Sequence, residues 1–257
     1  MKIGVNLGPT GNWTKVLEAA KKADEYGFDA LSFLDHYHAV KPEWGYVCGW
    51  SLYGALAMAT RRIKLVPMVI CRLNYLPGVL AKETAMLATM SDGRFELGIG
   101  AGDYFEEMHA WGIPVPKANE RIEGLKETVQ VLQEIWKGGK VTFEGKHVQV
   151  HNGLCVPMPD RAPRVVVGVG SSRRLLHSAV EYADELNVYA NEELMREARK
   201  EIEKAGREVT LSTFVWEWRE DIKEKLKEWE QLGVERTFVT FWEPFEKLEQ
   251  AANWMVM

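Results

Sequence analysis

The chain has 257 residues, of which 46% are hydrophobic and 27% are charged, and its formal net charge at pH 7 is −5. This composition is typical of a globular protein, and the length suits a single (β/α)₈ barrel. The sequence has no polybasic run, signal-peptide core or bilayer-length apolar stretch, which predicts a cytoplasmic protein without nucleic-acid or membrane partners.

The three cysteines are Cys48, Cys71 and Cys155, and they lie far apart in the sequence. An odd number of cysteines with no C-x-x-C spacing argues against a disulfide framework and against a zinc ribbon. We therefore expect reduced thiols, as in a cytosolic protein.

Short apolar segments alternate with longer segments of helical periodicity along the whole chain. The predicted strands are residues 2–7, 28–34, 63–70, 94–100, 164–170, 184–190, 208–218 and 235–242. The predicted helices are residues 14–27, 51–60, 78–90, 119–137, 173–183, 192–206, 220–233 and 245–255.

This alternation predicts an α/β fold with a parallel sheet, and eight strand–helix units favour a closed (β/α)₈ TIM barrel over a doubly wound sheet. Residues 140–150 contain a turn at Glu144-Gly145 and predict a short β-hairpin inserted after the fourth helix. No linker interrupts the pattern, so residues 1–257 are expected to form one domain.

In such a barrel the functional residues lie at the carboxyl ends of the strands. The second predicted strand is followed by Asp35, His36 and His38. Histidine gains and loses protons near neutral pH, so His36 is a candidate catalytic acid or base. The alternative is a loop histidine that only forms structural hydrogen bonds.

The third predicted strand contains Pro67, which cannot donate a ladder hydrogen bond. Either the strand bulges here, which would redirect the backbone beside the site, or the irregularity has no functional meaning.

The fourth predicted strand ends in the stretch FELGIGAGDYFEE, residues 95–107. A dinucleotide fingerprint would need a small residue where Asp103 stands, so Gly98 and Gly100 do not fit that motif. Alternate glycines on a strand face the same side, and we expect them to leave room for a flat, bulky group in the barrel mouth. Asp103 would then lie at the mouth, across from His36.

The fifth predicted strand leads into a stretch rich in glycine and serine, which is followed by an arginine in the first turn of a helix. Its residues are Gly168, Gly170, Ser171, Ser172 and Arg173. Backbone N–H groups, hydroxyls and a guanidinium at a helix start favour a phosphate group. The alternative is a simple helix N-cap formed by one of the serines.

The long loop over residues 37–50 is rich in aromatic residues. Trp44 and Trp50, together with Trp111 beyond the fourth strand, are expected to wall a substrate pocket or form a lid. Surface packing or a dimer face is the alternative, and the apolar helices after strands two and three predict a homodimer.

The pair His36-x-His38 is similar to paired histidines of metal-dependent barrel hydrolases. No later strand is followed by a histidine suited to complete a ligand set, so we expect no metal.

The stretch GRFELGIGAGDYFEE followed by NERIEGLKETVQVLQEIW resembles the luciferase-like flavin monooxygenase superfamily. It most resembles the branch that uses the deazaflavin coenzyme F-420. The segments KIGVNL, GFDALSFLDH, IKLVPMVICRLNYLPGVLAKETAML and VVVGVGSSRRLL follow in the order typical of that family.

The resemblance implies a flavin-type ring in the barrel mouth, with its phosphate after strand five. It implies a bulged third strand, often with a non-proline cis peptide, which here would fall near Met68–Val69. The implied cofactor-binding residues are Asp35, Met68, Val69, Ile70, Ala101, Gly102, Gly168, Gly170, Ser171, Ser172 and Arg173. An Asp-His pair such as Asp35-His36 is characteristic of deazaflavin dehydrogenases and reductases, and Asp103 matches the acid after strand four.

We therefore expect an oxidoreductase that transfers a hydride between F-420 and a small organic substrate, with His36 and Asp103 as catalytic residues. Ile70-Cys71-Arg72 and Ser171-Ser172 depart from the usual family residues. These departures leave open whether the cofactor is F-420 or FMN. The alternatives are an FMN-dependent monooxygenase that uses oxygen, a non-catalytic flavin-binding protein and, third, a metal hydrolase.

Overall fold

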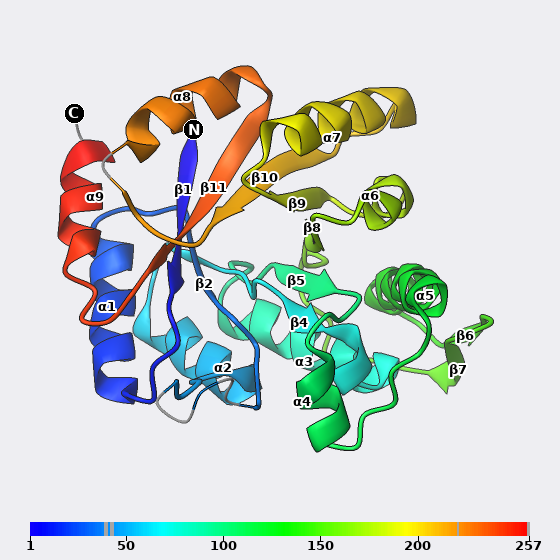
Figure 1. The fold of residues 1–257 in the computed structure, drawn as a ribbon. Coiled ribbons are helices and arrows are strands. Elements are labelled where there is room, and N and C mark those ends of the chain that lie inside the picture. The colour runs from blue at the N-terminus through cyan, green and yellow to red at the C-terminus, as the bar shows by residue number, and fades with distance from the viewer. Residues whose placement is uncertain (39–40, 42–43, 220, 256–257) are drawn as a thin grey trace.

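The chain folds as a parallel barrel surrounded by helices in a computed structural model, which describes all residues except 39–40, 42–43, 220 and 256–257 (Figure 1). The strands of the barrel are β1 (Lys2–Leu7), β2 (Ala30–Phe33), β3 (Lys64–Leu65), β4 (Ile70–Cys71), β5 (Leu97–Gly100), β8 (Val165–Gly170), β9 (Glu185–Tyr189), β10 (Thr210–Val215) and β11 (Val234–Phe241). They pair in the order β3-β2-β1-β11-β10-β9-β8-β5-β4, and each pairing is parallel.

The sheet order begins and ends on one interrupted strand, because β3 and β4 are the two halves of the third predicted strand. The first half pairs with β2 and the second half with β5, while a bridge joins Leu65 to Phe95. The sheet therefore curls back on itself, and the TIM-barrel prediction is confirmed.

Helices cover the outside of the barrel, as Figure 1 shows. They are α1 (Trp13–Glu25), α2 (Gly49–Ala59), α3 (Pro77–Met90), α4 (Phe105–Ala110), α5 (Ala118–Trp136), α6 (Arg173–Ala179), α7 (Glu192–Ala205), α8 (Ile222–Gln231) and α9 (Lys247–Met255), with a 3₁₀ turn at Arg72–Asn74. Strands β6 (Val141–Glu144) and β7 (Gln149–Gly153) form the predicted hairpin after α5. In the described part of the chain, no helix is long and apolar enough to cross a membrane.

The sequence pattern did not reveal the short helix α4, and it placed the end of α6 four residues too late. Gly102, which precedes α4, has a φ of 89° and ends the extended backbone of β5. A helix of six residues is too short to show a clear hydrophobic period.

The interruption between β3 and β4 lies where Pro67 stands, which agrees with the bulge that was one of the two alternatives there. Leu31 and Phe33 of β2 still accept hydrogen bonds from Val66 and Met68, at 2.9 and 3.1 Å, on either side of the proline. The Met68–Val69 peptide is cis and does not involve proline, which confirms the feature that the family resemblance implied.

The glycines of β5 have a different role from the predicted one. A Cβ atom at Gly98 would lie 1.6 Å from the carbonyl oxygen of Pro67, and one at Gly100 would lie 2.7 Å from a methyl group of Val69. Gly168 of β8 also faces Val69, at 2.8 Å from its ideal Cβ position. The prediction that the glycines clear room for a bound ring is therefore corrected at Gly98, which admits the bulged third strand of the protein itself. Gly100 faces Val69 and also lines the cavity described below.

The amino ends of the barrel strands enclose a network of charges. Arg236 of β11 is 3% exposed and donates hydrogen bonds to Glu185 and Glu96, each at 2.6 Å, and to Asp29 at 3.2 Å. Lys64 lies 3.4 Å from Glu96 and 3.5 Å from Asp29. We call Arg236, Lys64, Glu185, Glu96 and Asp29 the bottom network. Each of its carboxylates has a cationic partner within the barrel.

Candidate active site

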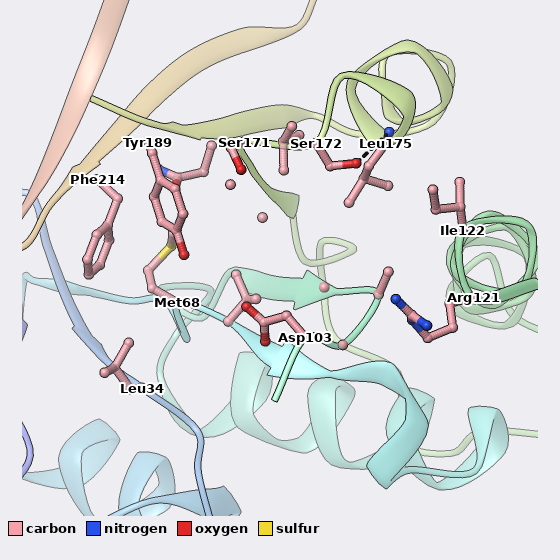
Figure 2. A pocket seen from close by; sticks show the side chains of 18 of the residues that line it. Leu34, Met68, Asp103, Arg121, Ile122, Ser171, Ser172, Leu175, Tyr189 and Phe214 are labelled. Atoms are coloured by element: carbon pink, nitrogen blue, oxygen red, sulfur yellow. Dashed lines mark hydrogen bonds between the residues drawn. The ribbon is translucent and has the colours of Figure 1, made fainter. Parts of the chain in front are cut away.

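A cavity of about 300 Å³ opens at the carboxyl ends of the strands (Figure 2). The bulged strand supplies Met68 and Val69 to its lining, and β5 and β8 supply backbone. The full lining comprises Leu34, Met68, Val69, Gly100, Ala101, Gly102, Asp103, Ala118, Arg121, Ile122, Gly168, Val169, Gly170, Ser171, Ser172, Leu175, Asn187, Tyr189, Phe214 and Trp216. The cavity therefore lies where sites form in barrels of this type.

One end of the cavity carries a cation from α5. Figure 2 shows the side chain of Arg121 directed toward the cavity from α5. Its Nη1 donates to the Pro116 carbonyl at 2.9 Å, and the guanidinium lies 4.7 Å from the ring centre of Phe105. Its Nε is buried and has no hydrogen-bond partner among the described residues. Such a nitrogen is expensive to leave unpaired, so it marks a place for an anionic ligand.

Hydroxyl groups line the cavity at the start of α6, between Arg121 and Tyr189 in Figure 2. Ser172 caps α6, since its Oγ accepts the Leu175 N–H at 3.2 Å, and Ser171 also lines the cavity. The simple N-cap that the sequence left open is therefore present at Ser172. Arg173 does not line the cavity, because it forms ion pairs with Glu193 and Glu197, each at 2.6 Å.

The end of the cavity that lies away from Arg121 is aromatic (Figure 2). Tyr189, Phe214 and Trp216, which we call the aromatic wall, come from the ends of β9 and β10. Phe214 and Trp216 have ring centres 4.9 Å apart, and Tyr189 lies 6.0 Å from Trp216. Burial raises the pKa of the Tyr189 phenol, and the negative charge of Asp103 raises it further. The phenol is thus a hydrogen-bond donor at neutral pH.

His36 stands beside a buried carboxylate of α4. The Nδ1 of His36 lies 3.5 Å from Glu107, which is 2% exposed and also accepts the backbone N–H groups of Tyr37 and His38 at 2.7 and 2.9 Å. Burial alone would raise the pKa of Glu107, but the neighbouring His36 and the backbone N–H groups of Tyr37 and His38 lower it overall. A carboxylate at Nδ1 orients the imidazole and leaves Nε2 for another partner.

Asp35 is also buried, behind His36. It accepts hydrogen bonds from the Gly49 N–H and the Tyr75 hydroxyl, each at 3.1 Å, and Tyr75 in turn is hydrogen-bonded to Tyr37. Burial raises the pKa of Asp35 from 3.8 to about 6, although these hydrogen bonds lower it. Asp35 thus fixes the loop after β2 and titrates close to neutral pH.

The structure brings nine of the predicted catalytic, cofactor and pocket residues together around the cavity and leaves the other seven outside its lining. Those in the lining are Met68, Val69, Ala101, Gly102, Asp103, Gly168, Gly170, Ser171 and Ser172. Those outside it are Asp35, His36, Ile70, Arg173, Trp44, Trp50 and Trp111. Ile70 is buried in the core.

The three predicted pocket tryptophans contact other aromatic rings. Trp44 lies 5.9 Å from Trp242, Trp50 lies 5.4 Å from Tyr75 and 6.3 Å from Phe95, and Trp111 lies 6.4 Å from His38. Trp50 thus packs toward the core, while Trp111 is 60% exposed near the His36 loop. Residues 39–40 and 42–43 of the predicted loop lie outside the described residues.

The residues of this region that sequence reasoning missed include Arg121, Glu107, Tyr189, Phe214 and Trp216. Tyr189 and Trp216 lie at or just beyond the carboxyl ends of two strands, so their position in the chain could have identified them. Nothing in the local pattern indicates that Arg121 and Glu107 point inward from helices. Among the described residues, no group of three or more histidine, cysteine or acidic side chains could hold a metal ion.

The family model of luciferase-like monooxygenases matches residues 1–216 of the chain. A curated relative, the F420-dependent glucose-6-phosphate dehydrogenase of Nakamurella multipartita (strain ATCC 700099), is 28% identical over 202 residues. The match covers 76% of this chain and 59% of the relative, so the chain spans little more than half the relative's length.

Solved structures share the whole barrel. An F420-dependent secondary alcohol dehydrogenase in complex with an F420-acetone adduct superposes with a TM-score of 0.85 at 17% identity, covering 96% of both chains. The coenzyme F420-dependent tetrahydromethanopterin reductase of Methanopyrus kandleri gives a TM-score of 0.80 at 18% identity, covering 98% of this chain and 95% of the other. At these identities the likeness establishes the fold.

Proposed function

The chain belongs to the luciferase-like monooxygenase family, and from this premise we propose that it is an oxidoreductase that transfers a hydride between the deazaflavin F-420 and a small organic substrate. The relatives and structural neighbours described above carry F420 in their names, which supports this cofactor over FMN. The Asp35-His36 pair after β2 agrees with a dehydrogenase or reductase.

The observation that carries the proposal is the shape and chemistry of the cavity. The bulged segment Met68–Val69 lines it, and Arg121 brings a buried nitrogen that has no hydrogen-bond partner among the described residues. Ser171 and Ser172 line it between Arg121 and Tyr189 in Figure 2. A flat ring with an anionic tail fits an apolar space that has donors at one end. Arg121 and Ser171 would hold the phosphate, and Met68, Val69 and Ala101 would pack against the ring.

When bound, a deazaflavin supplies a ring carbon that accepts or donates a hydride. As a substrate alcohol becomes a ketone, its carbon loses a hydride and its hydroxyl loses a proton to Nε2 of His36. Glu107, whose carboxylate lies 3.5 Å from Nδ1 of His36, stabilises the resulting imidazolium. Asp103, which lines the cavity, is the second candidate for proton transfer. In the reverse direction His36 returns the proton to the carbonyl oxygen.

We also propose that the protein is a cytoplasmic homodimer. Helices α2 and α3 pack together, yet they and the turn before α3 expose apolar side chains, among which Met58 and Leu76 are 73% and Val79 is 50% accessible. Apolar surface on neighbouring helices is typical of an interface. Light scattering should give twice the chain mass, and Met58→Lys with Val79→Lys should give the monomer mass; a monomeric wild type would refute this part.

The function is tested by adding F-420 and FMN separately to the purified protein. We expect F-420 fluorescence to be quenched at micromolar protein and a secondary alcohol or ketone to change its oxidation state. If FMN binds more tightly and oxygen is consumed, the protein is an FMN-dependent monooxygenase. Binding of F-420 without turnover of any substrate would indicate a non-catalytic member.

A further inference from the structure

We propose that the substrate of this site is an uncharged ketone or secondary alcohol with an aromatic or alicyclic body, and that phosphorylated sugars are excluded. The inference rests on the proposed function and concerns the end of the cavity that lies away from Arg121. The aromatic wall provides an apolar surface there, and the charged side chains around it disfavour an anionic ligand.

The aromatic wall offers a partly open apolar surface at the barrel mouth. Tyr189 and Trp216 are 37% and 48% exposed although they line the cavity, while Phe214 beneath them is buried. Leu34 and Met68 continue the apolar lining on the same side (Figure 2). Exposed aromatic rings of this kind gain free energy when a flat apolar molecule covers them.

The cations of this region are unsuited to hold a substrate phosphate. Arg121 is the one lysine or arginine among the described residues of the lining, and Figure 2 shows it on the side opposite Phe214 and Tyr189. In the proposed function that arginine is engaged by the phosphate of the cofactor. A second phosphate would need its own charge-assisted hydrogen bonds.

Two cations outside the lining have partners of their own. Arg219, in the loop after β10, lies 3.4 Å from Asp221, and Lys41 lies over the ring of Trp44 at 4.8 Å. Asp103 is the acid of the lining, and its negative charge reaches Tyr189 of the wall. An anionic substrate would therefore be repelled at this end of the cavity.

One polar group of the wall suits a neutral oxygen. The Tyr189 hydroxyl keeps its proton at neutral pH, and Figure 2 shows it directed into the cavity. It can donate a hydrogen bond to a carbonyl or hydroxyl oxygen of the substrate. A donor set within an aromatic surface is the combination by which a site selects a ketone or alcohol with an apolar body.

The test compares two probes on the protein loaded with F-420: 1-phenylethanol, with its product acetophenone, and glucose 6-phosphate. We expect 1-phenylethanol to reduce F-420 and glucose 6-phosphate to give no more than the background rate. In calorimetry, Trp216→Ala should weaken acetophenone binding about tenfold, and Tyr189→Phe should weaken it about threefold. Trp13→Ala, which removes another exposed tryptophan outside the lining, should leave binding unchanged.

Turnover of glucose 6-phosphate at a rate equal to that of 1-phenylethanol would overturn the substrate class and leave the F-420 chemistry intact. Acetophenone binding that is unaffected by both wall variants would overturn the role of the aromatic wall. If F-420 itself fails to bind, the proposed function fails, and this inference fails with it.

Discussion

The two ends of the barrel use charged residues in opposite ways. At the amino ends of the strands, Arg236 satisfies Glu185, Glu96 and Asp29 inside the barrel. At the carboxyl ends, Arg121 keeps a buried nitrogen without a hydrogen-bond partner among the described residues, and Asp103 lines an open cavity. Charged side chains that are fully paired within the protein, such as Arg236, therefore stabilise the fold. A charged side chain that lacks a partner beside a cavity, such as Arg121, is instead available to bind a ligand.

The strongest test of this contrast removes the cation of the bottom network. Arg236→Met should lower the free energy of unfolding by about 3–5 kcal/mol, because Glu185 and Glu96 would remain buried without their main partner, and only Lys64 would stay close to Glu96. Urea denaturation measures the loss, and Arg196→Met is the control because its exposed pair with Glu192 contributes little. Equal losses for both variants would show that the bottom network does not support the fold.

At the other end, His36→Ala should lower turnover at least about 100-fold while the fold and cofactor affinity stay intact. Glu107→Gln should lower turnover by a smaller factor, because it weakens the orientation of the imidazole and leaves the imidazole itself in place. Steady-state kinetics with fluorescence titration of F-420 separates the two quantities. Unchanged turnover in His36→Ala would remove this residue from the mechanism.

Asp35, after β2 at the carboxyl ends of the strands, should make the free energy of unfolding depend on pH. Its folded pKa of about 6 lies above its usual 3.8, so the folded state binds the proton more tightly than the unfolded state. This contribution to stability is fully present below about pH 4 and is lost as the pH rises through 6, a change of about 3 kcal/mol.

Asp35→Asn removes this titration and serves as the reference in the same experiment. Urea denaturation of both proteins between pH 4.5 and 7.5 should show the wild type losing stability relative to the variant as the pH rises. Parallel curves over this range would contradict the raised pKa.

The smallest expected effect separates two arginines that the sequence could not distinguish. Arg121→Met should weaken F-420 binding by about 10–100-fold, the value of one or two charge-assisted hydrogen bonds. Arg173→Met should change it less than about twofold, since Arg173 is already paired with Glu193 and Glu197. The reverse order of effects would restore Arg173 as the phosphate ligand.

The barrel was predictable because alternating strands and helices are a property of the local sequence. The break at Pro67 followed from its missing N–H, and the cis peptide at Met68–Val69 followed from the family resemblance. The role of Gly98 was not predictable, because the group that fills its missing side chain is a carbonyl from a strand some thirty residues away.

The cation of the cavity was missed for a similar reason. Arg121 lies on an amphipathic helix, where charged residues usually face water, and its direction depends on how α5 packs beside α3 and α6. Arg173 has the more suggestive sequence, directly after two serines, yet its partners come from α7. The directions of the Arg121 and Arg173 side chains therefore depend on tertiary packing, which the local sequence does not show.

We propose above that the cavity between the bulged strand and Arg121 binds a deazaflavin. Its most direct test is a fluorescence titration of F-420 with the wild-type protein, with FMN titrated in parallel. We predict saturable quenching with a Kd on the order of 10 μM or below for F-420 and weaker binding of FMN. No quenching of F-420 at about tenfold higher protein concentration would contradict the account.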